Sequence, residues 1–175
     1  MTEIEITCPL SGESISRLRA GDQVLISGVV YGARDQAHKR LCDLLAAGSD
    51  LPFELQGAVI YYVGPTPATG GRVIGSAGPT TASRMDAFTP MLMAAGLKGT
   101  IGKGYRGTAV QLAMVEYGAV HFAAMGGFGA LLSRHITSSE IVAYEDLGTE
   151  AIRKLTFERF PAVVAYDSRG GCVYT

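Results

Sequence analysis

Short apolar, β-branched segments alternate with helical segments along the middle of the chain, and this alternation constrains the fold more than any other feature. Strands are expected at residues 24–31, 58–63, 98–102 and 119–122, with helices at 34–47, 89–96 and 108–117. Such alternation favours a mixed α/β domain whose loops gather at one edge of the sheet, where folds of this kind bind ligands.

The last third of the chain has a different pattern. Apolar segments at residues 141–144, 153–160 and 163–166, followed by a turn at 167–171, favour antiparallel strands. A short strand at 73–74 and a helix opened by the glycines at 126–129 are also expected. With 175 residues and 47% hydrophobic content, the chain can bury one good core, so we expect a single domain over residues 1–175.

Residues 75–86, here called the signature segment, have the composition of an anion-binding loop. Glycine and proline bend the backbone tightly and leave it close to any guest in the bend, two threonines follow, and Arg84 comes one turn into a predicted helix. A helix N-terminus offers unpaired N–H groups, and arginine binds a carboxylate through two parallel hydrogen bonds. The expected guest is a small acid.

Three cations follow predicted strands, each at a turn or at a helix start: Arg34, Arg84 and Lys103. A compact fold can direct all three to one pocket, and a pocket with three cations suits a dicarboxylate. The alternative is that each cation pairs with a nearby acid such as Asp35 or Asp86, or lies in water.

Thr80 and Thr81 are the candidate hydroxyls of the signature segment. Thr81 also has the residue type of a helix N-cap. A threonine hydroxyl is a very poor base without an activating cation, metal or acid–base partner, and the sequence offers no such activator.

Asp86 and His38 are candidates for supporting roles around these residues. Asp86 can orient Arg84 by hydrogen bonding, or it can cap a helix turn. His38 lies four residues after Arg34 on the same helix face, with a helix-surface role as the alternative. His121, within a predicted strand, is interpreted as a core residue.

Several classes of function are disfavoured. The formal net charge of −1 and the absence of a long basic run argue against nucleic-acid binding. The first residues lack the pattern of a signal peptide, and no apolar run is long enough to cross a membrane, so we expect a soluble, cytoplasmic protein. Cys8, Cys42 and Cys172 are widely spaced, which favours reduced thiols and no metal site in this chain.

Six segments together resemble the β-type subunit of the iron–sulfur hydro-lyases, the family of class I fumarase and tartrate dehydratase. They are residues 32–40 (GARDQAHKR), 61–65 (YYVGP), 78–86 (GPTTASRMD), 102–104 (GKG), 126–127 (GG) and 144–148 (YEDLG). The threonine–arginine motif is highly specific, whereas the short glycine motifs mean little alone. The resemblance covers nearly the whole chain.

The resemblance implies a swivelling β/β/α three-layer domain with a mixed sheet, which partners an α-type hydro-lyase subunit carrying a [4Fe–4S] cluster within a higher-order hetero-oligomer. By the family pattern, Thr80 is the catalytic base, and Arg34, Arg84, Lys103 and Thr81 bind the substrate. The implied reaction is fumarate hydration to malate, with tartrate dehydration or hydration of mesaconate as alternatives. A non-catalytic anion-binding or scaffolding domain is the alternative from another class.

Overall fold

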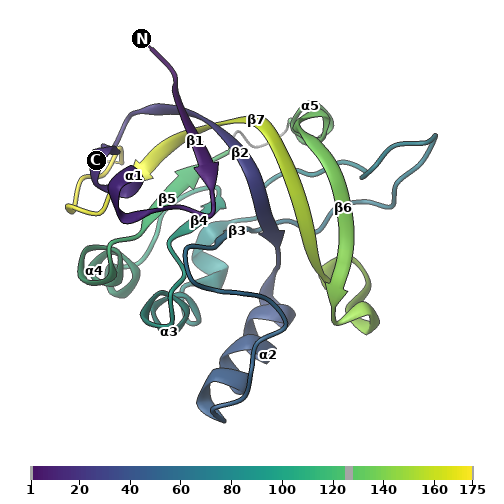
Figure 1. The fold of residues 1–175 in the computed structure, drawn as a ribbon, viewed down its shortest axis with the longest axis horizontal. Helices are drawn as coiled ribbons and strands as arrows, with labels where there is room; N and C mark the ends of the chain where they lie inside the picture. Colours follow the sequence, from purple (N-terminus) through teal and green to yellow (C-terminus); the bar gives the residue numbers. More distant parts are fainter. Residues whose placement is uncertain (1, 125–127, 175) are drawn as a thin grey trace.

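The computed structural model describes residues 2–124 and 128–174, and strands alternate with helices across the middle of the chain as the sequence predicts (Figure 1). They are β1 (Ile4–Cys8), α1 (Gly12–Arg17), β2 (Gln23–Gly32), α2 (Asp35–Ala46), β3 (Val59–Tyr61), the 3₁₀ helix η1 (Ala82–Met85), α3 (Thr89–Ala94), β4 (Gly99–Gly102), α4 (Thr108–Tyr117), β5 (Val120–Ala123), α5 (Gly129–Leu132), η2 (Ser133–His135), β6 (Ile136–Ala143), η3 (Glu145–Glu150) and β7 (Ile152–Tyr166).

The strands form one mixed sheet that closes on itself. Its order is β1-β2-β3-β4-β5-β7-β6, and β7 also pairs with β2, so that β2, β3, β4, β5 and β7 form a closed five-stranded barrel. The strands from β1 to β5 run parallel, whereas β7 is antiparallel to β2, β5 and β6. Figure 1 shows β7 crossing the molecule beside β2, with β6 on its outer side. The mixed α/β class is therefore confirmed, and the barrel closure is an additional feature.

Two hydrophobic clusters stabilise the fold, one on each face of the strands. Along β3 and the residue after it, Tyr61 belongs to the cluster that also holds Phe122 and Phe160, whereas Ile60 and Tyr62 belong to the cluster that contains the helices. This division follows from the strand period of two, because successive side chains point to opposite faces. The helix-side cluster includes Leu41, Leu92, Met93, Val110 and Met114. Helices α2, α3 and α4 therefore cover the outer face of the barrel.

The antiparallel strands predicted at residues 153–160 and 163–166 are one continuous strand, β7. Pro161 lacks an N–H group and so resembles a strand break in the sequence. In the structure, the ladder between β2 and β7 shifts register near Ser27, and Arg159 adopts a φ of 51° there. The Arg159 amide donates to the Ser27 hydroxyl over 3.0 Å. The ladder with β2 is regular again at Pro161, which pairs with Leu25, so the proline does not end the strand.

The strand predicted at residues 73–74 is wrong. Val73 and Ile74 lie in an irregular loop between β3 and η1. This loop closes on itself, because the Thr66 amide donates to the Ser76 carbonyl over 3.1 Å and the Ser76 amide donates to the Thr66 hydroxyl over 2.7 Å. These local bonds take the place of pairing with the sheet. The predicted helix opening at residues 126–127 lies outside the described residues, and α5 begins at Gly129.

Within residues 2–124 and 128–174, the structure contains no helix with the length and apolar character needed to span a bilayer.

Candidate functional site

The carboxyl ends of β2, β3 and β4 lie side by side and give the candidate site its position. The Ala33 amide donates to the Tyr61 carbonyl over 3.0 Å, and the Tyr62 amide donates to the Ile101 carbonyl over 2.8 Å. Because these strands are parallel, the segments that follow them leave the sheet at the same edge. Arg34, the loop toward Thr80, and Lys103 therefore begin next to one another.

The signature segment is bound to this edge through its backbone. The Thr80 amide donates to the Tyr62 carbonyl over 2.8 Å, and the Thr80 carbonyl accepts from the Lys103 amide over 3.1 Å. The Ala82 amide then donates to the Lys103 carbonyl over 2.8 Å, which completes a short parallel bridge between Thr81 and Lys103. The two candidate hydroxyls and the candidate lysine are thus held in one fixed backbone arrangement.

Arg34 occupies the N-cap position of α2 and lies against a glycine. A β-carbon built at Gly64 would be 2.3 Å from the Arg34 Nη1 atom, so only glycine leaves room for this guanidinium. The Arg34 Nε atom is buried and has no hydrogen-bond partner among the described residues. The two Nη groups of Arg34 carry the further N–H donors that can bind a carboxylate.

Arg84, on η1, forms an ion pair with Asp35 in the first turn of α2. The Nη2 atom is 2.7 Å from Oδ1, and the Nε atom is 3.3 Å from Oδ2. The Arg84 side chain is 46% exposed, so water also reaches it. The alternative of an acid partner therefore holds for Arg84, and this pair joins the signature segment to the helix that begins after Arg34.

Asp86 does not bond to Arg84, which corrects the sequence-based interpretation that it orients this arginine. Its Oδ1 accepts from the Arg106 Nε atom over 2.8 Å, and its Oδ2 accepts from the Gly107 amide over 2.7 Å. Asp86 therefore supports the signature segment by connecting its end to the turn that follows Lys103.

Arg106 is a residue whose importance the sequence analysis missed. Its side chain has no exposed area. Its guanidinium donates hydrogen bonds to the Asp86 carboxylate and to three hydroxyls, those of Tyr62, Thr100 and Thr89. It also lies 5.2 Å from the centre of the Tyr62 ring. The sequence held one indication of an ion pair with Asp86, because Asp86 is the single acid between residues 57 and 115 and several cations lie in the same range. Which cation it binds depends on tertiary structure.

His38 is fully buried, so the helix-surface alternative is wrong. Its Nδ1 atom lies 2.7 Å from the Arg34 carbonyl oxygen and must donate to it, which leaves the lone pair on Nε2. Burial lowers the pKa of His38 to about 4, so the ring is neutral near pH 7. Among the described residues no partner reaches Nε2. His38 therefore anchors the backbone of Arg34 and forms no hydrogen bond with its guanidinium.

His121 is buried, as expected for a core residue, and bonds to the Thr100 hydroxyl over 2.7 Å. Burial, together with the nearby Arg106 cation, lowers the pKa of His121 well below its usual value. His121 is therefore neutral and belongs to the buried surroundings of Arg106.

Thr81 and Thr89 lie at the starts of two helices, and of the two only Thr81 occupies an N-cap position. Thr81 flanks η1 without a capping bond from its side chain, which leaves its hydroxyl available. Thr89 is the first residue of α3, whose N-cap is Phe88. The Thr89 hydroxyl donates to the Met85 carbonyl over 2.8 Å and accepts from Arg106, so it serves the buried network and not the helix end.

The three cysteines lie in separate surroundings, with Cys8 buried in β1, Cys42 partly buried in α2 and Cys172 exposed after β7. Burial raises the pKa of the Cys8 thiol to about 12, which disfavours the thiolate that ligates metals. In the part of the chain that the structure describes, no three His, Cys, Asp or Glu side chains form a ligand group.

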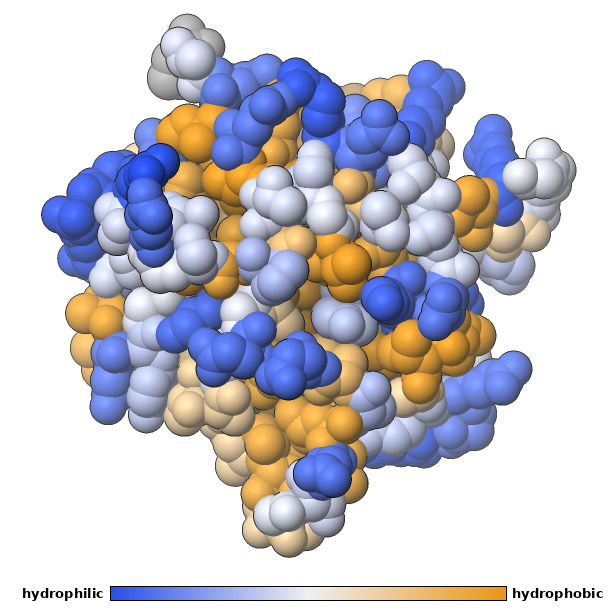
Figure 2. Space-filling view, viewed as in Figure 1, coloured by the Kyte–Doolittle hydropathy of each residue, from blue (hydrophilic) through white to orange (hydrophobic). Residues whose placement is uncertain are grey.

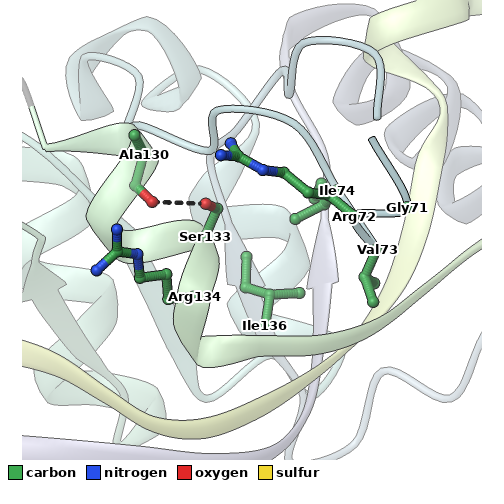
Figure 3. Close-up of a pocket in the computed structure, with 8 residues that line it drawn as sticks. All are labelled: Gly71, Arg72, Val73, Ile74, Ala130, Ser133, Arg134 and Ile136. Atoms are coloured by element: carbon green, nitrogen blue, oxygen red, sulfur yellow. Dashed lines mark hydrogen bonds between the residues drawn. The ribbon is translucent and has the colours of Figure 1, made fainter. Parts of the chain in front are cut away.

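A cavity of about 320 Å³ lies between residues 71–74 and the α5–η2 region, and none of the predicted site residues lines it (Figure 3). Figure 3 shows Arg72 extending across this cavity toward the hydroxyl of Ser133, which itself donates to the Ala130 carbonyl over 2.7 Å. Arg72 is one of the five cations between residues 57 and 115, as are Arg84 and Lys103. The structure thus places this cation in other surroundings.

Cations and hydroxyls at one edge of a mixed barrel define an α/β domain suited to binding small anions. The chain belongs to the family described as Fumarase C-terminus, whose model matches residues 1–175.

Relatives from several organisms agree with this assignment. The chain is 33% identical over 171 residues to the putative L(+)-tartrate dehydratase subunit beta of Methanocaldococcus jannaschii, covering 94% of this chain and 88% of that protein. It is 36% identical over 158 residues to the anaerobic class I fumarate hydratase of Escherichia coli, covering 89% of this chain. It is 33% identical over 165 residues to fumarate hydratase 2 of Leishmania major, covering 93% of this chain.

These homologues are hydro-lyases. The chain spans only 29% of the length of both fumarate hydratases, but most of the length of the tartrate dehydratase subunit. The resemblance drawn from the sequence motifs is therefore confirmed at the level of the family.

Proposed function

We propose that this chain is the β-type subunit of a two-subunit [4Fe–4S] hydro-lyase that acts on a small dicarboxylate, with fumarate hydration to malate as the first candidate. The observation that supports it is the backbone pairing of Thr81 with Lys103 beside Arg34, within a chain that matches the fumarase C-terminus family. Tartrate and mesaconate remain alternative substrates, because a hydroxyl or a methyl group is discriminated by pocket shape.

In this proposal, three cations hold the two carboxylates of the substrate. Arg34 and Arg84 supply planar guanidinium groups for bidentate bonds, Lys103 supplies a compact charge, and Thr81 supplies a hydroxyl. Removing a proton from the carbon next to a carboxylate places enolate-like charge on that carboxylate. Cations fixed by the protein before the reaction stabilise this charge without reorganising.

Thr80 is the proposed base that takes this proton. Its backbone is fixed by the bonds to Tyr62 and Lys103, so its side chain starts from a defined position at the site edge. A threonine hydroxyl needs an activator, and His38 is fully buried with its Nδ1 proton engaged by the Arg34 carbonyl. We therefore propose that the activating acid comes from the partner subunit.

The α-type partner is proposed to hold the cluster, which would supply a Lewis acid for the substrate hydroxyl. The name of the Methanocaldococcus jannaschii relative describes a beta subunit, and the fumarate hydratases that match are much longer single chains. We propose that this chain corresponds to one domain of such longer chains. In this arrangement it would swivel as a β/β/α unit against its partner, in a cytoplasmic hetero-oligomer.

A partner of this kind needs surface to cover, and the chain exposes apolar side chains on several elements. Leu112 and Val115 on α4 and Leu131 on α5 are each about half exposed or more. Figure 2 shows apolar surface interrupted by hydrophilic side chains on the face in view, not one continuous patch. No single interface is therefore assigned.

The proposal is tested by co-expressing the chain with an α-type hydro-lyase subunit and purifying the complex without oxygen. Fumarate, malate, tartrate and mesaconate are then assayed separately, with the chain alone as the control. We expect turnover of one diacid by the complex and none by the chain alone. If the chain binds diacids but recruits no partner and no iron, the anion-binding alternative is favoured instead.

A further inference from the structure

Arg106 connects the far end of the signature segment to the turn that carries Lys103. Backbone bonds already hold Lys103 against Thr80, at the beginning of η1. Arg84 lies at the other end of η1, which those bonds do not reach. The bond from the Arg106 Nε atom to Asp86, two residues after Arg84, fixes that second end.

The bonds of the Arg106 guanidinium have a defined direction, because arginine only donates. Its Nη1 atom donates to the Tyr62 hydroxyl over 2.9 Å, and its Nη2 atom donates to the Thr89 hydroxyl over 2.8 Å. Thr89 uses its one proton on the Met85 carbonyl, so the Tyr62 hydroxyl donates to Thr89. The guanidinium thereby connects the residue after β3 with α3 and the end of η1.

The position of Arg106 is itself fixed from both sides of the turn. Its backbone amide donates to the Tyr166 hydroxyl over 3.0 Å, and the Gly107 amide donates to Asp86. Nη1 also donates to the Thr100 hydroxyl over 3.1 Å, and that hydroxyl bonds to His121 Nδ1 over 2.7 Å. Removing one partner of such a buried cation is strongly destabilising, because the remaining charge stays desolvated.

We propose that Arg106 is a positioning residue that sets the spacing between Arg84 and Lys103, and so selects the length of the dicarboxylate. This inference rests on the proposed function, since it assigns these two cations to substrate carboxylates. Arg106 does not touch the substrate, because its side chain is fully buried. If Arg84 and Lys103 are held at a fixed spacing, they fit a diacid with one distance between its carboxylates. If that spacing varies, slightly shorter or longer diacids bind as well.

The test compares binding of succinate and glutarate, two unreactive diacids that differ by one methylene, to the assembled complex by calorimetry. Because one methylene is worth about 10- to 200-fold in a shaped pocket, we expect the wild type to prefer succinate by about tenfold or more. Arg106→Lys keeps the charge but cannot serve four acceptors, and the preference should fall toward unity. Tyr62→Phe, a milder change in case Arg106→Lys does not fold, should lower it by a smaller factor.

The control is Phe157→Leu, which removes packing from the opposite hydrophobic cluster and should lower the melting temperature without changing the ratio of the two dissociation constants. A wild-type ratio in both network variants would overturn this inference and leave the proposed function standing. A wild-type complex that bound neither diacid would contradict both. Complexes that discriminate the diacids but turn over none would contradict only the proposed reaction.

Discussion

Arg84 and Asp35 face each other across the boundary between η1 and α2, with Nη2 of the arginine 2.7 Å from Oδ1 of the aspartate. Asp35 engages the Nε edge of the guanidinium and leaves the Nη1 edge available to a substrate carboxylate. The ion pair is partly exposed, so its contribution to folding is small, about 0–1 kcal/mol. Its main effect is the orientation of Arg84.

Replacing Asp35 with asparagine should therefore affect substrate binding more than stability. We expect Asp35→Asn to raise KM by roughly fivefold to tenfold, the cost of a charge-assisted hydrogen bond made neutral, with little change in Tm. Steady-state kinetics of the assembled complex and thermal melting give the two values. A lowered KM would show instead that Asp35 competes with the substrate for Arg84.

Lys103 and Arg72 are both cations between residues 57 and 115, but only Lys103 lies at the candidate site, so their alanine variants can be compared. Lys103→Ala should lower kcat/KM by about 10²–10³, because a preorganised cation is lost from the developing charge. Arg72→Ala should leave kcat/KM near the wild-type value, since Arg72 lines a separate cavity. Both variants are measured in the same complex, and equal losses would argue against the assigned site.

Thr80 is fixed by backbone bonds that its side chain does not share. Thr80→Ala should keep these bonds, the melting temperature and partner binding, yet lose about 10²–10⁴ in kcat, the usual contribution of a positioned base. Thr80→Ser should retain much of the rate, because the hydroxyl remains. Exchange of the substrate carbon-bound proton with solvent reports the step directly. Normal exchange in Thr80→Ala would assign the base elsewhere.

Gly64 leaves the space that the Arg34 guanidinium occupies. In Gly64→Ala, the new methyl group would lie 2.3 Å from Nη1, so the flexible end of Arg34 must move while the backbone stays. A displacement of this size should cost on the order of 10² in kcat/KM through misplacement of one carboxylate. Gly12→Ala is the control, since nothing lies within 4 Å of its added methyl. Equal kinetics for the two variants would remove Arg34 from the site.

Because the pKa of His38 is lowered in the folded protein, the free energy of unfolding should depend on pH. The pKa is about 4 in the folded protein and about 6.5 in the unfolded chain, so the unfolded chain binds the proton more tightly. Stability is therefore full above pH 6.5 and falls as the pH drops toward 4, by about 3 kcal/mol for His38 alone. His121 acts in the same direction.

Urea unfolding across this range measures the slope of the free energy of unfolding against pH. His38→Asn keeps a donor near the Arg34 carbonyl but cannot titrate, so we expect a shallower slope. An unchanged slope would assign the pH dependence to other groups, His121 first.

Local patterns predicted most of the strands and helices and the edge at which the candidate residues meet. The helix at residues 108–117 has the same bounds in the structure, and β2 was anticipated from its β-branched run. Arg34 and Lys103 lie together because the carboxyl ends of parallel strands share an edge, which is a rule that needs no tertiary information. The roles of Asp86, Arg106 and His38 needed the structure, because partners far apart in the chain decide them.

Barrel closure was also beyond sequence reasoning. It depends on pairing between β2 and β7, which are separated by most of the chain, with a bulge near Arg159. Neither the long-range pairing nor the left-handed backbone at Arg159 leaves a periodic signal.

Because β7 closes the ring by pairing with both β2 and β5, the order of synthesis matters. A ribosome makes every candidate site residue well before it makes residues 152–166. Until then, the growing polypeptide carries two open sheet edges that can associate with those of neighbouring nascent chains. Pairing of β7 is therefore the step that completes the barrel. A molecule in which β7 fails to pair has all the candidate residues but lacks the closed barrel that fixes their relative positions.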